Sequence, residues 1–277
     1  MTHVTDWMTA LSTKEYDVET LQFYRACGIA GVELSIKADL CDQIDWGAFR
    51  KNADEAGIKI LSYHLPFSKQ TNIASPDEEI RKGAVAIQSA LIEKAAGIGI
   101  SRFVIHASMG PITDEERPQW MASAKKSLKE LAEFAARFQA VICVEDLPRH
   151  GLGHNTREML DLLEADERLR VCFDVNHLCL KNGSSHQEFI AALGNKIVTT
   201  HISDYDFVDE KHFFPGYGLI DWKALVEGLE QADYSGPFLY EGGFGPSPWA
   251  PDVPFGKIED ARNRQLTIKE LRGNQPG

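Results

Sequence analysis

The stretch Val171–His177, VCFDVNH, is the part of the chain that best indicates its fold. It begins as a short run of apolar and β-branched residues, which is typical of a strand covered on both faces. Asp174 and His177 follow at its carboxyl end. A carboxylate inside such a run would have to be paired or metal-bound, whereas at the end of the strand it can face a polar pocket. We therefore predict a buried strand that presents polar side chains to a pocket.

Five further stretches follow the same design, in which an apolar strand ends in histidine or glutamate. They are ILSYH (60–64), FVIH (103–106), VICVE (141–145), IVTTH (197–201) and FLYE (238–241). Histidine and the acidic residues are common metal ligands. Six strands that end in such residues indicate one shared site, and the rest of the chain then serves as its scaffold.

Helical patterns with caps and glycine stops separate the strands. We predict helices over 18–27, 45–56 (capped by Asp45 and ended by Gly57), 75–96 (capped by Ser75, with Glu78 completing a capping box), 118–138, 155 or 156 to 163, 186–193, 221–231 and 258–271. Two further strands are predicted, one over 31–36 with Glu33 inside it, and one within 3–10, where Thr5 and Asp6 interrupt the pattern. Strict alternation of strand and helix predicts βα units and a parallel sheet.

The number of βα units decides between two α/β folds. Eight units, counting the first strand, predict a (β/α)8 TIM barrel, whereas seven would leave an open doubly wound sheet as the alternative. A closed ring better explains why six strands converge on one site. The chain has 277 residues and is 43% hydrophobic, without a Pro/Gly/Ser-rich linker or a block of charge that divides it. We therefore expect a single domain over 1–277.

Composition narrows the class of protein. The sequence has no secretory signal pattern and no apolar run near the roughly 18 residues of a membrane helix, so we expect a cytoplasmic protein without a membrane partner. The five cysteines form no CxxC pair, which predicts reduced thiols. A net charge of −12 argues against a nucleic-acid partner, which normally requires a basic face. The sequence leaves open whether the chain is monomeric or homo-oligomeric.

Four strand-end residues form the candidate metal site: Glu145, Asp174, His201 and Glu241. Three carboxylates and one imidazole make a hard, oxygen-rich site that suits Mn²⁺, Mg²⁺ or Co²⁺, with Zn²⁺ as a further option. Without a cation, the three carboxylates would repel one another, which would drive their pKa values apart. Any one of the four could be an ordinary salt-bridged strand end, but as a set they indicate a bound metal.

Four histidines form a second group around the same pocket: His64, His106, His177 and His212. His64 and His106 end predicted strands, whereas His212 belongs to the long loop 204–218. A single histidine is usually an ordinary hydrogen-bonded residue. Because four of them lie at positions above the strands, we predict that they line the pocket and contact the substrate.

With these motifs the chain resembles the xylose isomerase-like barrel superfamily, in particular its sugar epimerase and isomerase group of the tagatose 3-epimerase type. The motifs are GVELSI, YHLPF, FVIHAS, VICVEDLP, FDVNH, HISDYD, PGYGLIDW and LYEGG. The resemblance implies a divalent metal ion held by Glu145, Asp174, His201 and Glu241. It also implies a small-molecule carbohydrate substrate, a ketose or related polyol ketone, which reacts by proton transfer through an enediolate. Glu145 and Glu241 would act as acid and base on opposite faces of the reacting carbon.

One departure from this group leaves the identity of the sugar open. The epimerases carry an arginine that contacts substrate shortly after the metal-binding histidine, whereas Asp204, Tyr205, Asp206 and Phe207 follow His201 here. The same superfamily includes inosose-type dehydratases and abasic-site nucleases of the endonuclease IV type, which use a trinuclear zinc site. The nuclease ligand types are present, with Glu210 in place of an aspartate. The acidic net charge favours a carbohydrate substrate over DNA, and therefore one catalytic metal ion over three. A non-catalytic sugar-binding barrel is the remaining alternative.

Overall fold

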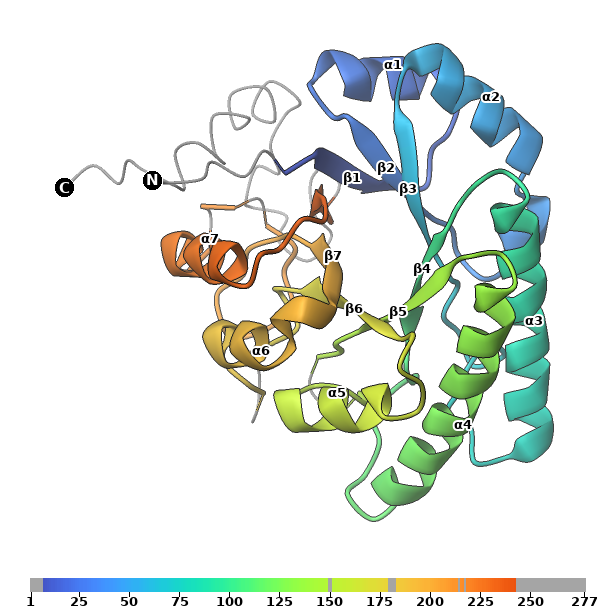
Figure 1. Ribbon diagram of the computed structural model, residues 1–277, viewed down its shortest axis with the longest axis vertical. Coiled ribbons are helices and arrows are strands. Elements are labelled where there is room, and N and C mark those ends of the chain that lie inside the picture. Colours follow the sequence, from blue (N-terminus) through green and yellow to red (C-terminus); the bar gives the residue numbers. More distant parts are fainter. Residues whose placement is uncertain (1–6, 149–150, 179–182, 214, 217, 243–277) are drawn as a thin grey trace.

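The structure is a computed structural model, which describes residues 7–148, 151–178, 183–213, 215–216 and 218–242 (Figure 1). Eight parallel strands form one sheet in the order β7-β6-β5-β4-β3-β2-β1-β8. The strands are β1 (Thr9–Thr13), β2 (Gly31–Ser35), β3 (Lys59–His64), β4 (Arg102–His106), β5 (Val141–Glu145), β6 (Arg170–Asp174), β7 (Ile197–His201) and β8 (Phe238–Tyr240). The helices are α1 (Val18–Ala26), α2 (Trp46–Ala56), α3 (Glu78–Ala96), α4 (Arg117–Ala136), α5 (Thr156–Leu163), α6 (His186–Leu193) and α7 (Trp222–Gln231), with short 3₁₀ helices at Cys41–Gln43 and Gly194–Lys196.

The sheet closes on itself between β7 and β8. The backbone N–H of Ile202 donates to the carbonyl of Leu239 at 2.8 Å, and the N–H of Glu241 donates to the carbonyl of Ile202 at 3.0 Å. Figure 1 shows the helices arranged around the outside of the strands. The predicted (β/α)8 TIM barrel is therefore confirmed, and the open doubly wound sheet is excluded.

Strand alternation divides the barrel interior into an apolar layer and a polar layer. Val104, Cys143 and Cys172 pack together inside the barrel. Two residues further along the same strands, the same face carries His106, Glu145 and Asp174, because side chains that are two positions apart point to the same side. The apolar layer therefore supports a ring of titratable side chains at the carboxyl ends of the strands, which is where TIM barrels place their active sites.

Most predicted elements lie where the sequence indicates, with two corrections near their beginnings. The first strand is Thr9–Thr13 and not within 3–10; it pairs Ala10 with Gly31 and buries Leu11. Helix α3 begins at Glu78 because Asp77, not Ser75, accepts hydrogen bonds from the first-turn N–H groups of Glu79 and Ile80. Ser75 instead accepts from the N–H of Asp77. The helix predicted over 258–271 lies outside the described residues.

Four of the five cysteines lie within the described residues. Cys27, Cys41, Cys143 and Cys172 are buried free thiols, and Cys179 lies outside the described residues. Among the helices of the described ranges, none combines the length and the apolar character needed to cross a bilayer.

A buried arginine joins α3 to α4 next to the β3–α3 loop. The Arg81 guanidinium donates to Glu78 at 2.7 Å and to the Ser127 hydroxyl at 2.9 Å, and it lies 3.1 Å from Glu130. The Ser127 hydroxyl in turn donates to the carbonyl of Ile73 at 2.7 Å. This network fixes the loop between His64 and α3, which also forms one side of the cavity described below.

Replacing Arg81 by Met should therefore destabilise the protein. The apolar stem would be kept, but Glu78, Glu130 and the Ser127 hydroxyl would each lose a contact with the guanidinium, so we expect Tm to fall by roughly 5 °C. The control is Lys82→Met on the same helix, whose ammonium lies 3.9 Å from Glu78 on an exposed face and should leave Tm nearly unchanged. Equal melting of the two variants would show that the Arg81 network does not hold α3 and α4 together.

Candidate functional site

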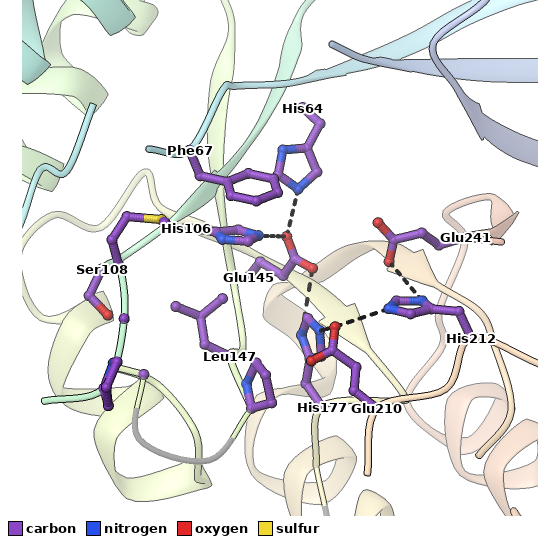
Figure 2. Close-up of a pocket in the computed structure, with 15 residues that line it drawn as sticks. His64, Phe67, His106, Ser108, Glu145, Leu147, His177, Glu210, His212 and Glu241 are labelled. Atoms are coloured by element: carbon purple, nitrogen blue, oxygen red, sulfur yellow. Dashed lines mark hydrogen bonds and ion pairs between the residues drawn. The ribbon is translucent and has the colours of Figure 1, made fainter. Parts of the chain in front are cut away.

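A cavity of about 480 Å³ opens at the carboxyl ends of the strands (Figure 2). Its polar lining includes all four predicted substrate-binding histidines, two of the predicted metal ligands and Glu210, and its apolar lining includes Phe67, Met109, Pro111 and Leu147. These side chains come from β3, β4 and β5, from the segments that follow these three strands, and from the segments that follow β6, β7 and β8. Parallel strands that end at the same edge thus bring together residues that are far apart in the sequence.

Glu145 lies at the centre of this arrangement, and both of its carboxylate oxygens are engaged. Oε2 lies 2.9 Å from Nε2 of His64 and 3.1 Å from Nε2 of His106. Oε1 lies 3.0 Å from Nδ1 of His201. Figure 2 shows His64 and His106 converging on one oxygen of Glu145.

The structure brings the four predicted metal ligands together. Each of Glu145, Asp174, His201 and Glu241 offers one ligand atom, and all four atoms lie within 4.8 Å of one another. Nδ1 of His201 faces the three carboxylates, at 3.0 Å from Glu145, 3.4 Å from Glu241 and 3.8 Å from Asp174. Their shared position at the mouth of the barrel agrees with the sequence prediction, and their role as ligands stays a prediction.

Two buried oxygens in this set show that the donor atoms suit a cation. Oδ2 of Asp174 and Oε2 of Glu241 have no hydrogen-bond partner among the described residues. A buried acceptor without a partner is costly, and three carboxylates outnumber the single imidazole nitrogen that they face. A divalent cation would supply the missing partner for both oxygens and offset the excess negative charge.

Glu33 belongs to the site although the sequence interpretation left it in a strand without a role. It is fully buried in β2, and its Oε1 accepts a hydrogen bond from Nε2 of His201 at 2.9 Å. Its Oε2 accepts from the hydroxyl of Ser62 at 2.6 Å. This pair of contacts fixes the His201 ring so that Nδ1 faces the carboxylates. The signal in the sequence was a charged residue within GVELSI, which requires a buried partner.

Burial and neighbouring charges shift the pKa values of the ligand set in opposite directions. Burial raises the pKa of Asp174 well above its usual range, and the nearby Glu241 and Glu145 add to this effect. Burial alone would lower the pKa of His201, but the surrounding anionic groups, Glu241, Glu145 and Glu33 among them, raise it well above its usual range. Both shifts favour the protonated forms, so a cation that binds to these residues competes with protons.

A second group of side chains lies beside the first. Nε2 of His212 lies 3.0 Å from Oε1 of Glu210, and Nε2 of His177 lies 3.6 Å from the same oxygen. Nδ1–H of His177 donates to the carbonyl of Asp146 at 2.7 Å. His177, Glu210 and His212 together offer ligand atoms within 4.8 Å of one another. The sequence interpretation noted Glu210 only as a substitute for an aspartate of the nuclease type.

Asp204 organises the loop that carries Glu210 and His212. Its buried carboxylate accepts hydrogen bonds from the N–H groups of Gly216 and Tyr205 and from the indole N–H of Trp222, at 2.8, 2.9 and 2.8 Å. A Cβ at Gly218 would lie 2.2 Å from the same carboxylate, so this close approach requires glycine. Asp204 thus acts within the loop, where its carboxylate is taken up by these contacts.

Comparison with known proteins shows which family of barrels the chain matches. A family model described as xylose isomerase-like TIM barrel matches residues 21–255. The D-psicose 3-epimerase of Ruminiclostridium cellulolyticum is 25% identical over 206 residues, covering 68% of this chain and 66% of that protein. The 3-dehydro-D-guloside 4-epimerase of Escherichia coli is 25% identical over 218 residues, covering 72% of this chain and 80% of that protein.

Two further comparisons bear on the fold and on the alternatives. A probable endonuclease 4 of Methanoculleus marisnigri is 27% identical over 136 residues, covering 47% of each chain. The chain thus spans just under two thirds of the psicose epimerase and about half of the endonuclease. A crystal structure of D-psicose 3-epimerase in the presence of D-fructose superposes with a TM-score of 0.78 at 18% identity, covering 96% of this chain and 100% of that one. This last likeness shows the shared fold.

Metal binding should release protons, and the affinity should therefore rise with pH. Asp174 and His201 have raised pKa values, so the gain in Mn²⁺ affinity should continue above the ordinary histidine range, near pH 6.5. Titration calorimetry at pH 7 in two buffers of different protonation enthalpy should show roughly one proton or more released per ion. An affinity that does not change between about pH 6 and pH 8, without proton release, would contradict the assignment of these ligands.

Replacing Glu33 by Gln should weaken metal binding without unfolding the barrel. The amide keeps the shape of the side chain but not the charge that orients His201 and increases its basicity, so we expect the affinity for Mn²⁺ to fall by about 10–100-fold. Glu19→Gln, on the exposed surface of α1, is the control and should bind as the parent does. Unchanged affinity in Glu33→Gln would mean that Glu33 has no part in the metal site.

Proposed function

The chain belongs to the xylose isomerase-like TIM barrel family, and from this premise we propose that it is a metal-dependent sugar epimerase or isomerase. Its substrate is a ketose or a related polyol ketone. The observation that carries the proposal is the convergence of Glu145, Asp174, His201 and Glu241, with two buried carboxylate oxygens left for a cation. The similarity to the psicose 3-epimerase and to the 3-dehydro-guloside 4-epimerase supports it.

In this proposal Glu145, Asp174, His201 and Glu241 hold one divalent metal ion. When bound, such an ion polarises a carbonyl and stabilises the negative charge that develops as the neighbouring carbon loses a proton. The residues of the chain have three tasks: they hold the sugar, they exclude water and they move the proton.

The two proposed acid–base residues differ in their freedom to reach a substrate. The side chain of Glu241 is 24% exposed and lines the cavity, and its Oε2 has no hydrogen-bond partner among the described residues. The side chain of Glu145 is 1% exposed, and ring nitrogens of four histidines lie within 3.7 Å of its oxygens. Glu241 is therefore better placed to take a proton from the reacting carbon. Glu145, whose position is fixed by the histidines, is the second carboxylate and acts on the other face of that carbon.

The remaining lining suits a sugar ring. His106, His177 and His212 supply polar groups to the cavity, and Leu147 and Phe67, which stacks on His106, supply apolar surface. Small-molecule pockets commonly combine an apolar surface with a few fixed polar groups, and a sugar has both an apolar C–H face and a hydroxyl edge. The substrate-binding role of His64, His106, His177 and His212 is part of this proposal.

Replacing Glu241 by Gln should leave a measurable share of the metal bound and remove most of the activity. An amide oxygen still coordinates weakly, but an amide cannot accept the proton, so we expect kcat to fall by about 10²–10⁴-fold. The assay is proton–deuterium exchange into ketoses with added Mn²⁺, with metal content measured in the same samples. Glu55→Gln, on the exposed surface of α2, is the control.

Near-normal exchange by fully metallated Glu241→Gln would show that Glu241 is not the base. Exchange alone does not separate an epimerase from an inosose-type dehydratase, because both abstract a proton next to a carbonyl. Analysis of the product does, because the dehydratase then eliminates water. Loss of water from an inosose substrate would therefore redirect the assignment within the same family.

A second candidate function is phosphoester hydrolysis at three metal ions, as in nucleases of the endonuclease IV type. Two further groups favour it, His64 with Glu145 and His201, and His177 with Glu210 and His212, because each could hold an additional ion. The net charge of −12 opposes it, since DNA binding normally requires a basic face. Elemental analysis decides: about one ion per chain supports the sugar enzyme, whereas three zinc ions together with cleavage of abasic DNA would favour the nuclease.

A further inference from the structure

A second cavity of about 1170 Å³ lies beside the first. It is lined by the segments that follow β1, β2 and β3 and by one face of α3, and we call it the outer cavity. These segments begin at the carboxyl ends of their strands. The first cavity, which we call the catalytic cavity, opens at the same ends. The two cavities share one lining residue, Phe67.

Phe67 is the junction between the two cavities. Its ring stacks on that of His106, with centroids 4.1 Å apart and an angle of 16° between the planes, and Figure 2 shows it beside His64 and His106. The residue is nevertheless 47% exposed. The preceding residue is anchored, because Gln88 of α3 donates to the carbonyl of Pro66 at 2.8 Å. A ligand that contacts His106 and extends past Phe67 therefore enters the outer cavity.

The outer cavity offers exposed apolar surface that a monosaccharide in the catalytic cavity would leave unused. Leu40 is 44% exposed and Ile87 is 39% exposed, and both line this cavity together with Phe67. Exposed large apolar side chains that gather around one hollow often mark a binding site. Hydroxyl and amide groups of Ser68, Gln70 and Thr71 lie in the same lining.

The charges of the outer cavity favour an uncharged ligand. Its lining contains three lysines, Lys14, Lys37 and Lys94, and three acidic residues, Glu15, Asp39 and Asp42. A site for a phosphate would carry an excess of positive charge, and this lining carries none. Apolar surface combined with balanced polar groups fits a second sugar ring, which presents a C–H face and hydroxyl groups.

The volumes of the two cavities, about 480 and 1170 Å³, leave room for a substrate larger than one sugar. Pockets of about 300–1,000 Å³ hold whole drug-sized ligands, so a catalytic cavity of about 480 Å³ is sufficient for the reacting ring alone. We propose that the outer cavity is a subsite for an uncharged glycosyl group, so that the substrate is a keto sugar within a glycoside or disaccharide. This inference rests on the proposed function for the reacting ring, and the glycosidic bond stays intact in the reaction.

The first test compares free and glycosidic substrates. Proton–deuterium exchange with Mn²⁺ is measured on a 3-keto hexose, on its phenyl glycoside and on the corresponding keto disaccharide. We expect kcat/KM to be at least about tenfold higher for the two glycosidic substrates. Ile87→Arg should fill the outer cavity and abolish this advantage, while exchange with the free sugar is unchanged.

The matched control is Ile80→Arg, on the same helix. Ile80 is 46% exposed and is not among the residues that line either cavity. This variant should keep the full preference for glycosidic substrates. Equal kcat/KM for free and glycosidic sugars in the parent protein, or an equal loss in both arginine variants, would overturn the subsite.

A second measurement does not depend on catalysis. Saturation-transfer NMR with phenyl β-D-glucoside should show contact with the parent and with Ile80→Arg, and little contact with Ile87→Arg. Binding that is the same in all three proteins would overturn the subsite even if the proposed function holds. Absence of exchange with every keto sugar, combined with binding that depends on Ile87, would overturn the proposed function and support the subsite.

Discussion

Three carboxylates that converge on one buried imidazole nitrogen impose the constraint on which the rest of the site depends. Glu145, Asp174 and Glu241 all lie within 3.8 Å of Nδ1 of His201. Negative charge this concentrated is costly away from water unless a cation or protons offset it. The raised pKa values of Asp174 and His201 have the same origin, because protonation also reduces the excess negative charge. The donor atoms and their charges thus favour the same conclusion, a divalent metal ion at the mouth of the barrel.

The register of the strands and the closure of the sheet bring these charged side chains together. Val104, Cys143 and Cys172 form an apolar layer two residues before the strand ends. The polar side chains therefore lie directly above this layer, at the mouth of the barrel. The hydrogen bond from the N–H of Glu241 to Ile202 both closes the sheet and places Glu241 beside His201. From the opposite side of the barrel, Glu33 fixes the His201 ring. Closure of the sheet thus also completes the ligand set, because it brings Glu241 next to His201.

The strand-end residues could be predicted from sequence because the rule that brings them together is local. Each is the last residue of an apolar strand or the next one, and parallel strands end at the same edge. Contacts that depend on distant partners could not be predicted in this way. Glu33 meets His201, which is 168 residues away in the chain. Asp204 holds its loop through Gly216 and Trp222, which are 12 and 18 residues away. The cap of α3 was misassigned because Ser75 and Asp77 both fit the local pattern, and only the backbone path decides between them.

The central claim is that Glu145, Asp174, His201 and Glu241 bind one divalent cation at the mouth of the barrel. Anomalous diffraction from crystals of the protein loaded with Mn²⁺ tests it directly, because the signal locates the metal without reference to the reaction. The account predicts a peak about 2.0–2.5 Å from one ligand atom of each of the four residues. Manganese bound elsewhere in the protein, with no peak between these four side chains, would contradict it.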